Sequence, residues 1–317
     1  MDRAFDKNEF NRFSCIETDF LVLGGTALLG SEFVNELAKS HNISATFHEA
    51  KPFKVGQVSW HRINAVDPVA LSNLLYLVRP KVVINCIALT DVDQCELNPK
   101  LADELNHLLP QALARICAEL GIYLIHISTD HYDSPLRTPR KEDDTLFGIN
   151  KYGKTKMQGE NSIQALNSSA LILRTNFFGY SKLRNDTFFN WIVDNLEKNF
   201  IINGFTDIEF SPISIFELIH CIFALQELKI SGIVNVSSDR SISKYDFISL
   251  VAKIFNFKAN LIKPSVSREV EGRVRRPSYM SLDNGKLCAI LQRKTTSLDS
   301  MIDQVRIDYL NSRSQKK

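Results

Sequence analysis

The sequence predicts an α/β protein with a doubly wound parallel sheet of the Rossmann type and a smaller C-terminal α/β substrate domain. Two observations predict this fold. From residue 19, short and continuously apolar runs alternate with segments of helical periodicity. Such runs are typical of parallel strands that helices cover on both faces. The first apolar run also leads into a glycine-containing turn, FLVLGGTALLGSEF, ahead of a helical segment.

The first half of the chain gives the elements of the main sheet in order. Strands are expected over 19–23, 43–47, 81–88, 122–127 and 170–173. Helices are expected between them, over 28–40, 68–78, 99–120 and 150–166. Gly121 is expected to end the third of these helices, because glycine tolerates the left-handed conformation that follows a helix.

The second half has a more mixed pattern. Helices are expected near 187–198, 215–228 and 244–255, and a strand at 233–236 is expected to return to the main sheet. We therefore expect a dinucleotide-binding domain over 19–175 and a mainly substrate-binding part over 176–317. Residues 1–18 are expected to form an irregular extension, and residues 311–317 a solvated tail.

Composition excludes several classes of function. A formal net charge of +2 over 317 residues gives no strong field for a nucleic acid polymer or a membrane surface. The six cysteines form no Cys-x-x-Cys pair, which favours reduced thiols and a cytoplasmic protein. The start is too polar for a secretory signal, and no apolar run reaches the ~20 residues of a membrane helix. No residue spacing predicts a metal site.

The glycine turn is a candidate phosphate site. Gly24 would permit a tight turn, and Gly30 would let the helix approach the strand, so that backbone N–H groups face a pyrophosphate. Thr26 adds a hydroxyl. Ala27 stands where a glycine is usual, and a positive φ there would cost on the order of 1 kcal/mol. A plain strand–turn–helix corner remains the alternative.

The residues after the second strand bear on the choice of cofactor. His48, Lys51 and Lys54 favour a 2′-phosphate and therefore NADPH, whereas Glu49 would favour NADH if it points inward.

Three side chains form a candidate active site. Thr129 follows the strand at 122–127, and Tyr152 and Lys156 lie four residues apart on the next helix, hence on one face. An ammonium near a phenol lowers the pKa of the phenol and makes it a usable proton donor. By chance alone, a chain of this composition is expected to contain about 0.5 Tyr-x-x-x-Lys patterns, so the spacing by itself is weak evidence. The pattern supports an active site because it follows both the glycine turn and Thr129 along the chain.

The chain here resembles the extended short-chain dehydrogenases/reductases and is most similar to the dTDP-4-dehydrorhamnose reductase family. The matching stretches span most of 19–290 and run in the family's order. They are VVINCIALTDVDQCELNP, ELN, ISTD, YGKTKMQGE, LRTNFFG, SPISI, GIVNVSS and RRPSYMSLDNGKL. The chain departs from the family after ISTD, where His131-Tyr-Asp-Ser-Pro135 replaces an aromatic, Asp-Gly-containing turn.

The resemblance implies a catalytic trio of Thr129, Tyr152 and Lys156, with Lys156 also holding the nicotinamide ribose. It implies a set of cofactor-binding residues: Gly24, Thr26, Ala27, Leu28, Leu29, Gly30, His48, Lys51, Asn64, Ala65, Asn85, Cys86, Ile87, Ala88, Asn106, Tyr152, Lys156 and Thr175. It also implies residues on the substrate side: Thr90, Asp130, Asn176, Phe177, Ser211, Pro212 and Arg276.

The expected function is NADPH-dependent reduction, with NADH possible, of a nucleotide-linked 4-keto-6-deoxysugar for surface polysaccharide. The expected partner is the nucleotide-diphosphate sugar itself, and a homodimer is a further expectation. Two alternatives stay open: a nucleotide-sugar epimerase or dehydratase of the same fold, and a non-catalytic NADP-binding subunit like the β subunit of methionine adenosyltransferase.

Overall fold

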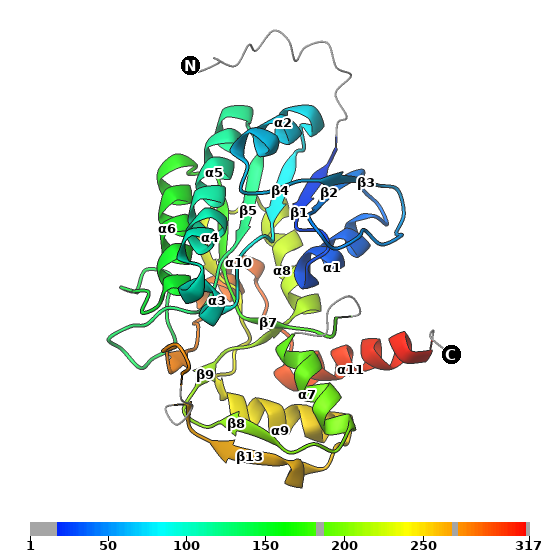
Figure 1. Cartoon of the computed structure of the whole chain (residues 1–317), viewed down its shortest axis with the longest axis vertical. Coiled ribbons are helices and arrows are strands. Elements are labelled where there is room, and N and C mark those ends of the chain that lie inside the picture. Colours follow the sequence, from blue (N-terminus) through cyan, green and yellow to red (C-terminus); the bar gives the residue numbers. More distant parts are fainter. Residues whose placement is uncertain (1–17, 182–186, 268–271, 315–317) are drawn as a thin grey trace.

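The main sheet organises the upper part of the molecule. A computed structural model describes residues 18–181, 187–267 and 272–314 of the chain (Figure 1). Seven parallel strands lie in the order β11-β6-β5-β4-β1-β2-β3. They are β1 (Phe20–Leu23), β2 (Ile43–Phe47), β3 (Val58–Arg62), β4 (Val82–Asn85), β5 (Tyr123–Ile127), β6 (Leu171–Arg174) and β11 (Gly232–Asn235). The order reverses at β1 and β4, where doubly wound sheets bind their ligands.

Helices cover both faces of this sheet. They are α1 (Leu28–Leu37), α2 (Pro68–Val78), α3 (Val92–Leu97), α4 (Pro99–Asp103), α5 (Leu109–Leu120), α6 (Lys151–Leu166), α8 (Ile215–Glu227) and α10 (Gly285–Leu291). Local sequence fixes several of their ends. Asp67 caps α2 ahead of Pro68, Asn150 caps α6, and Gly121 with φ +67° ends α5 as expected.

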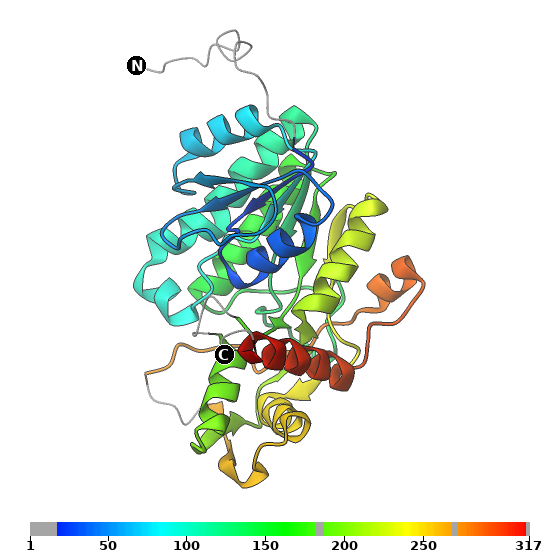
Figure 2. The same ribbon diagram turned by 90° about the vertical axis from the view of Figure 1, so that its right-hand side faces the viewer.

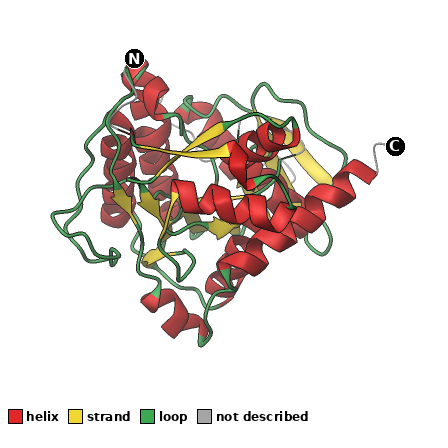
Figure 3. Ribbon diagram, turned by 90° about the horizontal axis from the view of Figure 1, so that it is seen from below, coloured by secondary structure: helices red, strands yellow, loops and turns green. Residues whose placement is uncertain are grey.

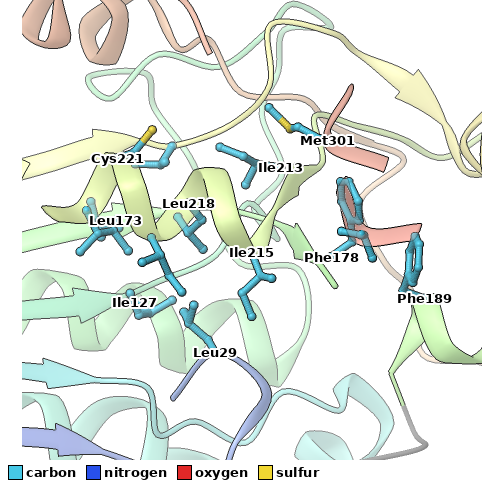
Figure 4. Packing of buried hydrophobic residues seen from close by; sticks show 14 of the residues in the cluster. Leu29, Ile127, Leu173, Phe178, Phe189, Ile213, Ile215, Leu218, Cys221 and Met301 are labelled. Atoms are coloured by element: carbon cyan, nitrogen blue, oxygen red, sulfur yellow. The ribbon is translucent and has the colours of Figure 1, made fainter. Parts of the chain in front are cut away.

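The hydrophobic core has two layers, one on each face of the sheet. One layer joins α1 and α8 to the strands, and the other joins α2, α5 and α6 to them. Figure 4 shows the first layer, where Leu218 and Ile215 of α8 lie near Leu29, Ile127 and Leu173. Because α8 comes from the second half of the chain, this layer ties both halves together.

The lower part of the molecule is a smaller α/β lobe, here called the lower lobe. Its helices are α7 (Phe188–Glu197), α9 (Lys244–Phe255) and the 3₁₀ turn η3 (Ala259–Leu261). Its strands are β8 (Ile202–Phe205), β9 (Glu209–Phe210), β12 (Ile242–Ser243), β13 (Ile262–Ser265) and β14 (Tyr279–Met280). Strands β7 (Phe177–Phe178) and β10 (Ile213–Ser214) pair at the junction, and α11 (Leu298–Ser314) lies across it (Figures 2 and 3).

The expected return of one strand to the main sheet is confirmed, since β11 pairs with β6 in parallel. Other expectations need correction. Strand β3 was not expected, and α1 ends at Leu37 rather than at residue 40. The segment expected as one helix over 99–120 contains a π-helical turn, η2 (Glu104–Leu108).

The expected solvated tail is also wrong for residues 311–314. These residues belong to α11, and Ser312 is buried with its hydroxyl donating to the Tyr309 carbonyl at 2.7 Å. Apolar residues of the same helix, including Met301 and Val305, are buried in the core. The expected extension over 1–18 lies outside the described residues except for Thr18, which is buried.

Candidate active site

The glycine turn between β1 and α1 is built to bring backbone close to a ligand. Gly24 has φ +79°, and a Cβ on Gly30 would lie 2.1 Å from the Gly24 carbonyl oxygen. Ala27 is the N-cap of α1 with φ −74°, and its side chain caps no N–H group. The alanine therefore costs no left-handed strain, contrary to the cost considered from sequence. The uncapped helix end fits an anionic group such as a pyrophosphate.

The basic residues expected to bind the adenosine end of the cofactor are exposed. His48, Glu49, Lys51 and Lys54 are all exposed on the segment after β2. Arg62, the last residue of β3, is exposed beside them, and its Nε donates to the His48 carbonyl at 3.2 Å. Sequence reasoning missed Arg62 because it missed the strand that carries it. The arginine adds a planar donor to the basic cluster that would meet a 2′-phosphate.

The candidate trio comes together beyond the carboxyl end of β5. Thr129 is 4% exposed and Tyr152 is 8% exposed, and Thr129 lies close enough to Tyr152 to lower the pKa of the phenol. Thr129 Oγ1 accepts from the His131 N–H at 3.1 Å. Tyr152 lies in the first turn of α6, which Asn150 fixes by accepting from the Gly153 N–H at 2.9 Å. Lys156 is 1% exposed, and its Nζ donates to the Ile127 carbonyl at 2.8 Å.

The electrostatics of Tyr152 differ from the expectation. Burial raises the pKa of Tyr152, and the neighbouring Thr129 lowers it only in part. The expected lowering by Lys156 is absent among the described contacts, because that ammonium is turned to the Ile127 carbonyl. Burial also lowers the pKa of Lys156 to about 8, against the raising effect of Glu160. Tyr152 is therefore a neutral phenol, able to donate a proton.

A buried ion pair supports the floor of the site. Glu160, one further turn along α6, accepts from Arg174 Nη2 at 2.8 Å and from Nε at 3.1 Å. Its other partners are the hydroxyls of Tyr132, at 2.8 Å, and of Ser128. Glu160 and Arg174 are 1% and 7% exposed. The network holds the Ser128–Asp130 segment against α6, and so fixes Thr129 relative to Tyr152.

The loop after Thr129 packs directly on the tyrosine. The His131 ring meets the Tyr152 ring edge-on at 5.2 Å, and its Nε2 accepts from Asn150 Nδ2 at 2.9 Å. Burial and then the charge of Arg276 lower the pKa of His131 to about 3, so this imidazole is neutral. The same Asn150 amide donates to the Arg275 carbonyl at 2.9 Å. The loop, α6 and the segment near residue 275 are thus locked together.

Residues from both lobes meet on the substrate side. Asp130 is 2% exposed, and its Oδ2 accepts from Asn176 Nδ2 at 2.8 Å. Lys244, the first residue of α9, lies over the Phe210 ring at 3.3 Å. Burial raises the pKa of Asp130 and lowers that of Lys244, and the attraction between their charges opposes both shifts. Sequence reasoning missed Lys244, which only the fold brings to Asp130.

The arginines near residue 275 divide their roles. Arg276 Nη2 is paired with Asp93 Oδ2 at 2.8 Å, and its Nη1 donates to the Val274 carbonyl at 3.1 Å. Arg273 lies over the Phe205 ring at 4.6 Å, and its Nη1 is buried with no hydrogen-bond partner. Arg273 therefore carries a buried donor that no group of the described chain satisfies, while Arg276 anchors its segment to α3.

The remaining expected residues differ in burial and in their contacts. Asn106, in η2, is 0% exposed and holds the Leu89 backbone through both amide atoms, at 2.9 and 3.0 Å. It positions the neighbouring chain. Thr175 is 4% exposed, and its hydroxyl has no hydrogen-bond partner. Asn64 and Thr90 are exposed, Ala65, Cys86, Ile87, Ala88 and Phe177 are half-buried, and Ser211 and Pro212 are buried.

Over the described ranges, no group of His, Cys, Asp and Glu could hold a metal ion. No helix in the described part of the chain is both long and apolar enough to cross a membrane. Cys86, Cys95, Cys117, Cys221 and Cys288 are free thiols, and Cys15 lies outside the described residues.

Curated proteins with two different roles are similar to this chain. The probable low-salt glycan biosynthesis reductase Agl14 of Haloferax volcanii is 31% identical over 83% of this chain and 88% of its own length. The methionine adenosyltransferase 2 subunit beta of Mus musculus is 27% identical over 84% of this chain and 80% of its own length.

Solved structures agree with the fold. A dTDP-4-dehydrorhamnose reductase of Clostridium acetobutylicum superimposes with a TM-score of 0.79 at 25% identity, over 92% of this chain and 99% of that one. The dTDP-4-dehydrorhamnose reductase of Bacillus anthracis, in complex with NADP, has a TM-score of 0.79 at 21% identity, over 92% and 100% of the two chains. The Rossmann-type fold is confirmed.

The family comparison covers nearly all the described residues. The model of the RmlD substrate binding domain matches residues 18–308, which include the glycine turn, the candidate trio and the lower lobe. The predicted resemblance to extended short-chain dehydrogenases/reductases is confirmed, and the chain belongs to the RmlD substrate binding domain family.

Proposed function

We propose that this protein is an NADPH-dependent reductase of a nucleotide-linked 4-keto-6-deoxysugar. The observation that carries the proposal is that the Thr129 and Tyr152 hydroxyls are buried close to each other, with Tyr152 one helical turn from Lys156. The names of two similar proteins, a glycan biosynthesis reductase and a dTDP-4-dehydrorhamnose reductase, support the reaction class.

The chain's own residues account for the proton and for the orientation of the sugar. NADPH, when bound, supplies the hydride that adds to the keto carbon. Tyr152 gives its phenolic proton to the oxygen that becomes an alkoxide, and Thr129 holds that oxygen by a hydrogen bond. Lys156, protonated at neutral pH, would hold the nicotinamide ribose of the cofactor. The proton lost by Tyr152 is then regained from solvent.

Other residues of the chain would bind the rest of the cofactor and of the substrate. Gly24, Gly30 and the uncapped N-terminus of α1 would hold the pyrophosphate, and His48, Lys51 and Arg62 the 2′-phosphate that favours NADPH over NADH. Asp130 and Asn176 would face the sugar, and Arg273 its diphosphate. The carboxylate of Asp130 is already bound to Asn176, which supports a reductase over an epimerase or dehydratase that needs a free acid–base group.

The experiment is a turnover assay on the full chain. Loss of NADPH absorbance is followed with dTDP- and UDP-linked 4-keto-6-deoxyhexoses, and cofactor binding is measured separately by calorimetry. The proposal expects turnover with at least one such sugar and tighter binding of NADPH than of NADH. Tight NADPH binding without turnover on the whole panel would overturn the reductase assignment.

The second candidate is a non-catalytic subunit, and the likeness to the methionine adenosyltransferase 2 subunit beta favours it. An intact trio does not separate the two roles. Co-purification with a methionine adenosyltransferase catalytic subunit, together with no turnover, would support this candidate. A cytoplasmic location and a homodimer also remain proposals, and sedimentation would test the second.

A further inference from the structure

His126, a buried residue of β5, lies between the side chains of Asn85 and Lys156. It is 0% exposed. Its Nδ1 lies 3.1 Å from Asn85 Nδ2, and its Nε2 lies 3.4 Å from Lys156 Nζ. Asn85 is itself 0% exposed at the end of β4. The three residues form a line across β4, β5 and α6.

Asn85 can be oriented in only one way. Its other amide atom lies 3.1 Å from the Ile87 backbone nitrogen. A backbone N–H can only donate, so the atom that faces it is the carbonyl Oδ1. The Nδ2 group therefore donates toward His126, and His126 Nδ1 must be the bare, accepting nitrogen. A neutral imidazole with a bare Nδ1 carries its hydrogen on Nε2.

That hydrogen points at the Lys156 amine. An ammonium facing an N–H group would set hydrogen against hydrogen, whereas a neutral amine offers a lone pair. We propose that Asn85 fixes the tautomer of His126, and that His126 is a positioning residue whose Nε2–H donates to Lys156 and favours its neutral form. This proposal deepens the proposed function, on which its meaning for the reaction rests.

The other groups around Lys156 act in the opposite sense. Glu160, two turns from Tyr152 on α6, and Cys86, after β4, each favour the ammonium. Burial favours the amine, and the pKa of Lys156 falls to about 8. Burial and the charge of Lys156 also lower the pKa of His126, which keeps the imidazole neutral. With a pKa of about 8, Lys156 can both carry and release a proton near neutral pH.

The direct test is the tautomer of His126 in ¹⁵N-labelled protein without cofactor or substrate. Long-range ¹H–¹⁵N spectra assign each ring nitrogen as bare or protonated, and the His126 signals are identified by their loss in His126→Leu. The proposal expects a bare Nδ1 and a protonated Nε2 over roughly pH 6 to 9, around the ordinary histidine pKa. The reverse tautomer, or a doubly protonated ring, would overturn it.

The second test measures the shift of the Lys156 titration midpoint in His126→Leu, and the two tautomers predict shifts in opposite directions. If Nε2–H donates to the amine, His126→Leu removes a group that favours neutral Lys156, and the Lys156 titration moves up by about one pH unit, or tenfold in proton affinity. If Nε2 accepts from the ammonium, the same variant moves it down. The ¹³Cε shift of Lys156 is followed, assigned by its loss in Lys156→Arg. An unchanged or lower midpoint overturns the proposal.

A control variant separates the effect of His126 from that of removing any histidine, and the choice of readouts separates this proposal from the proposed function. His61→Leu removes a half-buried imidazole that contacts Ser44 Oγ at 3.2 Å, far from Lys156, and should leave the Lys156 midpoint unchanged. Should His126→Leu fail to fold, the His126 signals are identified by sequential backbone assignment of the unaltered protein, and its tautomer still decides. Because neither readout needs turnover, a correct tautomer in a protein without reductase activity would refute the proposed function alone.

Discussion

The two ends of the proposed cofactor site are built differently. At the proposed nicotinamide end, Thr129, Tyr152 and Lys156 are at most 8% exposed, and buried hydrogen bonds hold Thr129 and Lys156. At the proposed adenosine end, His48, Lys51 and Arg62 are exposed, and within the described part of the chain a single side-chain hydrogen bond, from Arg62 to the His48 carbonyl, joins them. The first end depends on fixed geometry, whereas the second depends on charge that solvent screens.

The largest effect is expected at the buried ion pair beneath the nicotinamide end. Glu160→Gln leaves Arg174 as a buried charge without its partner, which costs about 3–5 kcal/mol of unfolding free energy. Urea unfolding would measure this loss. In Glu36→Gln, the exposed pair with Lys39 should cost no more than about 1 kcal/mol. Equal losses in both variants would contradict the contrast between buried and exposed groups.

The pH dependence of turnover tests the charge at the same end. The pKa of Lys156 is lowered to about 8, so its ammonium is present below that pH and is lost as the pH rises through it. Turnover with saturating cofactor and substrate should therefore fall about tenfold for each pH unit well above the midpoint. In Lys156→Arg this limb should vanish, because arginine stays protonated. A limb that persists in Lys156→Arg belongs to another group.

At the adenosine end the expected change is in cofactor preference. Arg62→Ala should weaken NADPH binding about tenfold, the loss of one charge-assisted hydrogen bond, and leave NADH binding unchanged. Calorimetry at low and high salt would measure both, and the NADPH effect should shrink at high salt. Arg115→Ala, an exposed arginine on α5, is the matched control. A parallel loss for both cofactors would mean that Arg62 does not meet the 2′-phosphate.

The smallest effect is expected at the glycine turn between the two ends. Ala27 has φ −74°, so Ala27→Gly relieves no strain and should change NADPH affinity by no more than about twofold. Calorimetry would again measure it. A much tighter complex would show that the alanine methyl obstructs the pyrophosphate, and a large loss that the turn does not face it.

The sequence predicted the buried end well, because its information is local. Apolar strands and helix periodicity located β5 and α6, and four-residue spacing placed Tyr152 and Lys156 on one face. The missed elements depend on tertiary structure. Strand β3, with His61 and Arg62 in a half-exposed run at the sheet edge, has little apolar signal. Lys244 and Asp130 influence each other's pKa only because the fold brings the first residue of α9 near the segment after β5.

The spacing of residues along the chain also did not predict which groups the site residues bind by hydrogen bonds. The i,i+4 rule predicted Lys156 beside Tyr152, but burial made the Ile127 carbonyl its hydrogen-bond acceptor. Likewise, His126 lies in the apolar run at 122–127, where the sequence alone indicates no polar partner. Its side chain is buried, yet both ring nitrogens face polar groups from other elements.

The most direct test of the account is the single-turnover rate of NADPH oxidation by Tyr152→Phe with a 4-keto-6-deoxysugar substrate. Removing the proton donor should slow this step by about 10²–10⁴-fold, while NADPH affinity, measured separately, stays within a few-fold of the unaltered protein. An unchanged rate in Tyr152→Phe would contradict the account, because the proton would then come from another group.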